Sequence, residues 1–185
     1  QPWGPGAVIS DVRLFDSSET GSALLGEVDN RTLSSYFAYS IKGHTIGGGY
    51  QKAWGETPFA FVNGTDTYLF GESLVSTFTA PNEPIWFARY DFDFVALGIP
   101  GLTFGLKYVK GDDVDPALLN TRQAAALRVD GQSGKEWERV TDIAYVVQSG
   151  PVKGLSVLWR NSTNRSNYAD SGDENRFIVR YTLNF

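Results

Sequence analysis

The last ten residues alternate between two kinds of side chain, and this alternation constrains the fold more than any other feature of the chain. One parity carries only apolar or aromatic side chains, at Phe177, Val179, Tyr181, Leu183 and Phe185. The other parity carries Arg176, Ile178, Arg180, Thr182 and Asn184. A period of two is typical of a β-strand. The segment is therefore predicted to be a strand with one apolar face and one face that carries two arginines.

The same period recurs along the chain. At 84–95 the apolar parity includes Trp86 and Tyr90, and the opposite parity includes Arg89. Further alternating segments lie at 8–16, 33–41, 44–53, 102–109, 142–148 and 155–160, of which 8–16 and 44–53 alternate more weakly. With the terminal segment, these predict an all-β chain of about eight strands in antiparallel, up-and-down order.

The connections between these segments alternate between short and long. Short ones lie at 42–43, 98–101 and 150–154, and long polar ones at 17–29, 54–83, 111–135 and 161–173. Transmembrane barrels of the outer membrane have this arrangement, with short periplasmic turns and long extracellular loops. We therefore expect 1–185 to belong to a single β-barrel domain, with 54–83 and 111–135 as long extracellular loops and both ends of the strand series on the periplasmic side.

Two of the long connections carry patterns of their own. The β-like runs Thr67–Phe70 and Ser73–Thr79 lie inside 54–83, and we interpret them as loop structure folded into the pore mouth. Pro116–Arg128 is expected to form a short helix within its loop.

Composition excludes several classes of protein. Among the 185 residues there is no cysteine, so disulfides and thiolate metal sites are not available. A net charge of −5 argues against binding of nucleic acid through a general basic surface. His44 is the only histidine, which leaves a catalytic triad or a histidine metal site without a second member. Neither a metal nor a cofactor is expected.

The main structural alternative is a soluble β-sandwich or barrel that buries the aromatic face in its core. Strands of about ten residues fit a tilted membrane strand better, because soluble strands usually have about five or six. The terminal Tyr181, Leu183 and Phe185 are similar to the signal by which the assembly machinery of the bacterial outer membrane recognises its barrels. The chain starts at Gln1 without a leader, so we expect a mature product or a piece of a longer chain.

Several phrases resemble the C-terminal part of the OprD family of substrate-specific porins from pseudomonads and related bacteria. They are GEVDNRTLSSYFAY (26–39), GHTIGGGYQKAWGETPF (43–59), NEPIWFARYDFDF (82–94), GIPGLTFGLKYVKGD (98–112), EWERVTDIAYVVQSGPVKGLSVLWRN (136–161) and DENRFIVRYTLNF (173–185). The resemblance implies a monomeric 18-stranded barrel in contact with outer-membrane lipid, of which this chain forms somewhat less than half. A self-closing eight-stranded barrel remains the alternative, and barrels of that size are filled by side chains.

The resemblance also implies roles for the side chains on the inward parity. The basic ones would form a ladder that guides a substrate carboxylate, and they are Arg180, Arg160, Lys107, Arg89, Arg176 and Arg13. The acidic or polar pore-lining candidates are Asp91, Asp93, Asp142, Ser34 and Tyr36. Arginine suits this role because its planar fork binds a carboxylate through two hydrogen bonds. The acids either bind a substrate ammonium or merely neutralise neighbouring arginines.

These residues predict a passive channel for small carboxylate solutes rather than an enzyme. Aromatic or other monoacids are favoured, and basic amino acids remain possible if the acids on the wall are exposed. One alternative is an outer-membrane barrel hydrolase that uses Asp91 and Asp93 as a carboxylate pair. The other is a soluble β-rich binding protein.

Overall fold

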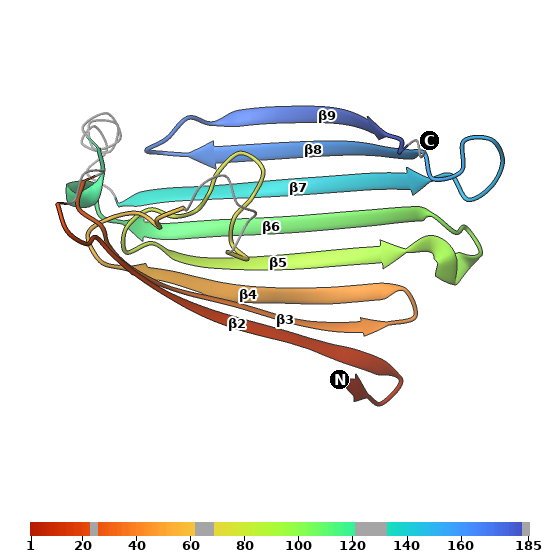
Figure 1. The fold of residues 1–185 in the computed structure, drawn as a ribbon, viewed down its shortest axis with the longest axis horizontal. Coiled ribbons are helices and arrows are strands. Elements are labelled where there is room, and N and C mark those ends of the chain that lie inside the picture. The colour runs from red at the N-terminus through yellow and green to blue at the C-terminus, as the bar shows by residue number, and fades with distance from the viewer. Residues whose placement is uncertain (23–25, 62–68, 121–132, 183–185) are drawn as a thin grey trace.

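The computed structural model describes residues 1–22, 26–61, 69–120 and 133–182, which form one antiparallel sheet of nine strands. Each strand pairs with its neighbours in the chain (Figure 1). The strands are β1 (Pro2–Trp3), β2 (Gly6–Ser18), β3 (Asp29–Ile41), β4 (His44–Trp54), β5 (Pro84–Asp93), β6 (Leu102–Val114), β7 (Gly134–Val146), β8 (Ser156–Ser166) and β9 (Gly172–Arg180). The eight predicted strands are thus confirmed, and the two-residue β1 is an addition. No helix in the described ranges is long and apolar enough to cross a membrane.

The tight turn between β3 and β4 shows how the sequence sets the register. Lys42 and Gly43 both have positive φ, of 49° and 83°. This is the backbone of a two-residue hairpin whose twist matches that of the strands on either side. It pairs Ile41 directly with His44. The 3₁₀ turn η1 (Phe94–Leu97) similarly connects β5 to β6, and Gly98 ends it in the left-handed conformation.

Connection lengths follow the predicted alternation at most positions. The connections 42–43, 94–101 and 147–155 lie at one end of the sheet, on the right in Figure 1, and the strand ends that 19–28, 55–83 and 115–133 join lie at the other. The prediction of a long connection at 161–173 is wrong, because β8 and β9 are longer than expected and only residues 167–171 join them. The first residues of the expected helix Pro116–Arg128 form the 3₁₀ turn η2 (Pro116–Leu118), and 121–128 lie outside the described residues.

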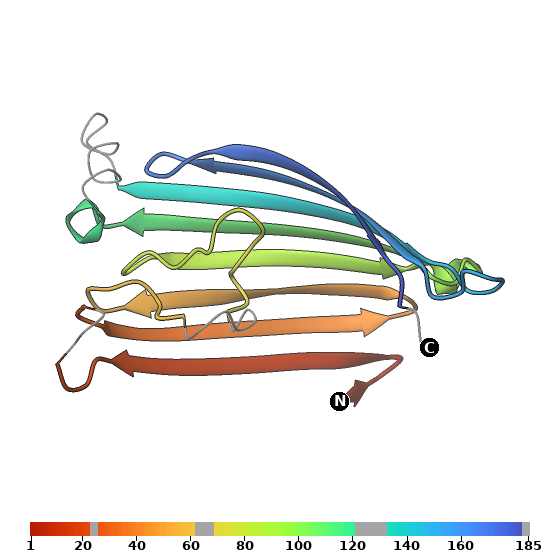
Figure 2. The same ribbon diagram turned by 45° about the horizontal axis from the view of Figure 1, so that its top comes forward.

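The two faces of the sheet differ as the alternation predicts. We call the face that carries the 55–83 connection the inner face and the opposite one the outer face (Figure 2). On the outer face Trp86 is 45% exposed and Phe177 71% exposed. Arg89, Lys107 and Arg160 lie on the inner face, in register with buried or polar neighbours. The rings and the basic residues that the sequence assigns to opposite parities thus lie on opposite faces of the sheet.

The buried core is small and lies between the sheet and the connection rather than inside the sheet. Phe78 of the connection packs on Ile85, Phe87 and Val109, with Tyr36 at the edge of the cluster. Many large apolar side chains instead lie exposed on the outer face, among them Val12, Leu14, Trp86 and Phe177. The connection is thus a docked part of the fold.

The apolar band of the outer face runs diagonally across the sheet. One register row begins at Val8 on β2 and ends at Asn175 on β9. We call the end of the sheet with the long connections the loop side and the end with the short ones the turn side. On β2 the exposed apolar side chains lie on the loop side of this row, up to Leu14. On β9 they lie on its turn side, at Phe177 and Val179. This is a shift of roughly one residue per strand, which corresponds to a strand tilt of roughly 35 to 40°. Outer-membrane barrels have tilts of this size.

Candidate functional site

The described part of the 55–83 connection is fixed to the inner face mainly by Glu138 of β7. Its carboxylate accepts hydrogen bonds from the backbone amides of Leu74, Val75 and Ser76, at 3.0, 3.1 and 2.9 Å. The Ser162 hydroxyl of β8 donates to the same carboxylate at 2.7 Å. Because Glu138 is fully buried, these bonds compensate the cost of removing its oxygens from water. The segment 74–76 is therefore tied to the wall by one carboxylate.

Gln51 and Ser34 form a second anchor on the neighbouring strands. The Gln51 side chain donates to the Phe78 carbonyl at 3.0 Å and accepts from the Gly71 amide at 3.1 Å. Ser34 donates to Gln51 at 3.0 Å and accepts from the Phe70 amide at 2.9 Å. Both side chains are buried beneath the connection. Ser34 thus lies on the inner face, where it contacts the docked connection.

Glu83, the last residue of the connection before β5, is also fully buried. The Ala80 amide donates to one of its oxygens at 3.3 Å, while Oε1 has no partner among the described residues. Burial and the nearby charge of Glu136 raise the pKa of Glu83 well above its usual range. A Cβ at Gly111 would lie 1.8 Å from Glu83 Oε1, so only glycine leaves room for this carboxyl.

A cleft of about 420 Å³ opens where the connection meets β5 to β8. Residues 72–74 line one side of it. The wall of the sheet lines the other with Arg89, Asp91, Gly105, Lys107, Asp142 and Arg160. Five of the predicted site residues are therefore brought together around one cavity, which Gly105, Leu106 and Val140 also line.

Both arginines of the cleft are held by a carboxylate through two hydrogen bonds. Arg89 donates from Nε and Nη2 to Asp91 of its own strand, at 2.7 and 2.9 Å. Arg160 donates in the same way to Asp142 across the β7–β8 pair, at 2.7 and 2.5 Å. The acids therefore pair with the arginines, as one of their two expected roles requires, and the paired bonds also orient the guanidinium groups. Each guanidinium keeps N–H groups that none of these bonds uses.

Lys107 joins the cleft to the connection. Its ammonium donates to the backbone carbonyls of Phe70 and Glu72, at 3.0 and 2.5 Å. It also lies 5.5 Å from the centre of the Phe87 ring. Lys107 thus holds the connection in place and brings its charge to the edge of the cleft.

The other three basic candidates lie on the same inner face but outside the cleft. Arg13 pairs with Asp11 at 2.6 Å and covers the Phe70 ring at 4.2 Å. Arg176 pairs with Glu174 on β9. Arg180 is exposed and makes no ion pair within the part of the chain that the structure describes. The six basic side chains therefore share a face but differ in how firmly they are held.

Two further candidates have local structural contacts. Asp93 accepts a hydrogen bond from the Val95 amide at 2.9 Å and caps η1, away from Asp91 and its arginine. Tyr36 stacks on Phe87, with ring centres 6.1 Å apart, beneath the connection. Asp91 and Asp93 therefore do not form the carboxylate pair that a hydrolase would use.

The prediction missed the anchoring residues Glu138 and Gln51, and it also missed Glu136, whose carboxylate accepts a hydrogen bond from the Ser76 hydroxyl at 2.7 Å. The segment 134–141 continues strand β7, with Glu136 and Glu138 on the inner parity and Trp137 on the outer one. Charged side chains occur on both parities of this segment, so the sequence does not distinguish an apolar face from a polar one there. Nothing local in the sequence shows that Glu138 contacts residues more than 60 positions away.

Comparison with known proteins gives one family for the whole chain. The family model described as outer membrane porin, OprD family, matches residues 1–185. Porin D of Pseudomonas aeruginosa is 35% identical over 187 residues, which cover 94% of this chain and 42% of that protein. The porin-like protein GalP of Pseudomonas putida is 36% identical and covers 99% of this chain and 41% of its own length. The chain thus spans about two fifths of the curated relatives it matches.

Solved structures agree with this assignment. OccK9 (OpdG) of Pseudomonas aeruginosa matches with a TM-score of 0.87 and 41% identity, over 98% of this chain and 44% of that one. OccK2 (OpdF) of the same organism, solved in complex with glucuronate, matches with a TM-score of 0.83 and 38% identity, over 97% of this chain and 46% of that one. The nine-stranded sheet is therefore part of a barrel of this type.

Proposed function

The chain belongs to the OprD family of outer membrane porins, and from this premise we propose that it forms the wall of a channel for passive, selective uptake of small carboxylate-bearing solutes. The observation that supports this is the cleft between residues 72–74 and the sheet, where Arg89, Lys107 and Arg160 gather. A carboxylate leaving water in a narrow passage needs such fixed opposite charges. A related channel has been solved with glucuronate, a small acid.

Within this class we propose aromatic or other monoacids as the favoured solutes. Asp91 and Asp142 are occupied by Arg89 and Arg160, so neither is left free to bind the ammonium of a basic amino acid. The spare N–H groups of the arginines remain for a carboxylate. Basic amino acids are the competing substrate class, and they would require these acids to release their partners.

The test is single-channel recording of the complete polypeptide in a planar bilayer, with benzoate and arginine compared as permeants. Arg160→Gln and Arg165→Gln form a matched pair, because both lie on β8 but only Arg160 faces the cleft. Loss of one charge-assisted bond of about 1.5 to 3 kcal/mol should raise the benzoate concentration that half-saturates the current about tenfold or more in Arg160→Gln. Arg165→Gln should behave as wild type. An unchanged benzoate response after removal of Arg180, Arg160 and Lys107 together would reject the proposal.

We also propose that the complete protein is monomeric and that Tyr181, Leu183 and Phe185 form the assembly signal. Tyr181 lies just beyond β9, where its hydroxyl donates to the Pro151 carbonyl at 3.3 Å. Leu183 and Phe185 lie outside the described residues. Replacement of Phe185 by serine should lower the amount of folded porin in the outer membrane, measured by its heat-modifiable migration in gels. Replacement of the neighbouring Asn184 by serine is the control.

A further inference from the structure

Four basic side chains surround Trp137 on the outer face. Trp137 pairs with Lys110 on β6 and with Arg165 on β8, so both flank it in its register row. Lys135 and Arg139 precede and follow it by two residues on β7 and therefore share its face. Neighbours of this kind lie about 5 to 7 Å apart. One indole thus lies at the centre of a compact basic patch.

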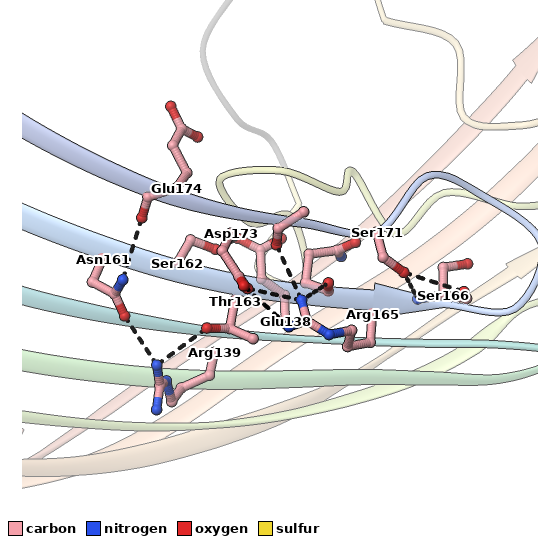
Figure 3. A network of polar contacts seen from close by, with 12 residues as sticks. Glu138, Arg139, Asn161, Ser162, Thr163, Arg165, Ser166, Ser171, Asp173 and Glu174 are labelled. Atoms are coloured by element: carbon pink, nitrogen blue, oxygen red, sulfur yellow. Dashed lines mark hydrogen bonds and ion pairs between the residues drawn. The ribbon is translucent and has the colours of Figure 1, made fainter.

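The excess of positive charge in this patch lies on β7. Lys110 pairs with Asp112 at 2.7 Å, and Arg165 pairs with Asp173 at 2.8 Å. Arg139 instead donates from Nη2 to two neutral groups, the Asn161 side chain at 2.9 Å and the Thr163 hydroxyl at 3.2 Å, as Figure 3 shows. Lys135 makes no side-chain hydrogen bond or ion pair within the described residues. Two cations are thus left without an acid partner of their own.

The contacts of Arg139 also fix its direction. Asn161 and Thr163 hold the guanidinium through Nη2 alone, and its other N–H groups have no partner among the described residues. A guanidinium held in this way loses little conformational entropy when it binds an anion. Its planar fork suits the oxygens of a phosphate.

The patch lies at the loop-side border of the apolar band. The Trp137 ring stacks on Tyr108 with centres 5.8 Å apart, and Tyr108 in turn contacts Trp86 at 5.4 Å. Such a belt of aromatic rings marks the level of the lipid head groups in membrane proteins. On β7 and β8 the next row toward the turns holds Thr141 and Asn161, and the row after it holds Ile143 and Trp159. The basic patch is therefore at the height where head-group phosphates are found.

We propose that Arg139 and Lys135, with Trp137 beside them, bind the phosphate group of a membrane lipid on the outside of the barrel. The phosphate accepts hydrogen bonds from the free N–H groups of Arg139 and from the ammonium of Lys135. The adjoining acyl chains then lie along the apolar band below. This site is on the face opposite the carboxylate cleft, so it does not depend on the proposed substrate.

The test measures lipid retention by the complete porin, purified in detergent, with native mass spectrometry. The probes are diphosphoryl lipid A, whose phosphates carry a net negative charge, and phosphatidylcholine, whose single phosphate is balanced by its own quaternary ammonium group. The variant is Arg139→Gln with Lys135→Gln. The matched control is Arg31→Gln with Lys52→Gln, which removes the same charges from the same face on β3 and β4.

The Arg139/Lys135 variant should bind diphosphoryl lipid A about tenfold or more weakly than wild type, as expected for the loss of two charge-assisted contacts. The control should bind as wild type, and phosphatidylcholine should bind all three proteins weakly. Equal retention of lipid A by variant and control would overturn the proposal. So would displacement of lipid A by inorganic phosphate at the same concentration, because the site would then recognise free phosphate.

Channel recordings separate this proposal from the previous one. Benzoate conduction should be unchanged in the Arg139/Lys135 variant, because both side chains lie on the outer face. A change in the benzoate response without a change in lipid retention would contradict the proposed lipid site.

Discussion

The carboxylate of Glu138 accepts a hydrogen bond from the backbone amide of Ser76 at 2.9 Å, which joins β7 to a segment 62 residues earlier in the chain. The same carboxylate binds the two preceding amides. A carboxylate that receives three amide protons satisfies donors that would otherwise be buried without partners. The position of the connection over the inner face therefore depends strongly on this one side chain.

Replacement of Glu138 by alanine should release the 74–76 segment from the wall. Loss of hydrogen bonds to a charged group costs about 1.5 to 3 kcal/mol each, so the segment should become accessible to protease and the single-channel conductance should rise. Glu174→Ala is the matched control, because Glu174 is also an inner-face carboxylate but pairs with Arg176. Equal protease sensitivity in the two variants would show that Glu138 is not the anchor.

Replacement of Asp142 by asparagine should make the channel more selective for anions. Asp142 holds Arg160 through two bonds, and its removal leaves the guanidinium without a compensating charge in the cleft. The reversal potential in a potassium chloride gradient should shift toward the equilibrium potential of chloride. Asp173→Asn, which frees Arg165 on the outer face, should leave the reversal potential where it is in wild type.

Gly105 should set part of the cleft's width. A Cβ at this position would lie 3.2 Å from Asp91 Oδ1 and 3.7 Å from the Asp142 Cβ, so alanine fits only with a small shift. Gly105→Val places two more methyl groups between the acids, and conductance should fall stepwise from glycine to alanine to valine. Ala88→Val, on the outer face of the adjacent strand, should have no such effect. A conductance that is independent of residue 105 would place the narrow point elsewhere.

Docking of the connection should weaken as pH rises. Because burial raises the pKa of Glu83, its protonated form favours the docked state. This stabilisation is complete below the usual carboxyl pKa of 4.5 and is lost as pH rises through the elevated value. Glu83→Gln should remove this dependence and keep the segment protected from protease at alkaline pH.

A matched control for the pH effect is available in another connection. The Val28 amide donates to Glu19 at 2.8 Å and lowers the pKa of that carboxyl. Glu19→Gln should therefore leave the pH dependence of protease cleavage within residues 69–83 unchanged. If wild type and Glu83→Gln lose protection at the same pH, another group controls the docking.

Strands were predictable where their two faces differ in polarity. Phe177 and Arg176 lie on opposite faces of β9, as the alternation in the sequence predicts. The pattern ends early on β8, because residues 161–166 are polar on both parities, and the strand nevertheless continues to Ser166. Hydrogen bonds to neighbouring strands continue outside hydrocarbon, where no apolar face is required. The sequence therefore reveals the part of each strand that contacts lipid better than its full length.

The site was predictable in part for the same reason. Parity alone places Arg89 and Arg160 on the inner face, and the i+2 spacing allows Asp91 to pair with Arg89 on one strand. The pair between Asp142 and Arg160 requires the register of β7 with β8, which the sequence does not reveal. The anchors at Glu138 and Gln51 depend on contacts distant in sequence, so no local pattern predicts them.

The outer apolar band crosses the hydrogen-bonded rows diagonally, and its direction shows which cations of the inner face lie at the same depth in the membrane. Neighbours in a hydrogen-bonded row differ in depth, whereas residues that step down by about one position per strand share a depth. Counted along the register from β2 to β8, Arg13, Arg89, Lys107 and Arg160 lie within about one residue of a single depth, although Arg89 and Lys107 are direct partners in one row. The four charges therefore lie at nearly the same depth along the barrel axis. A solute that moves along this axis would meet them together rather than one after another.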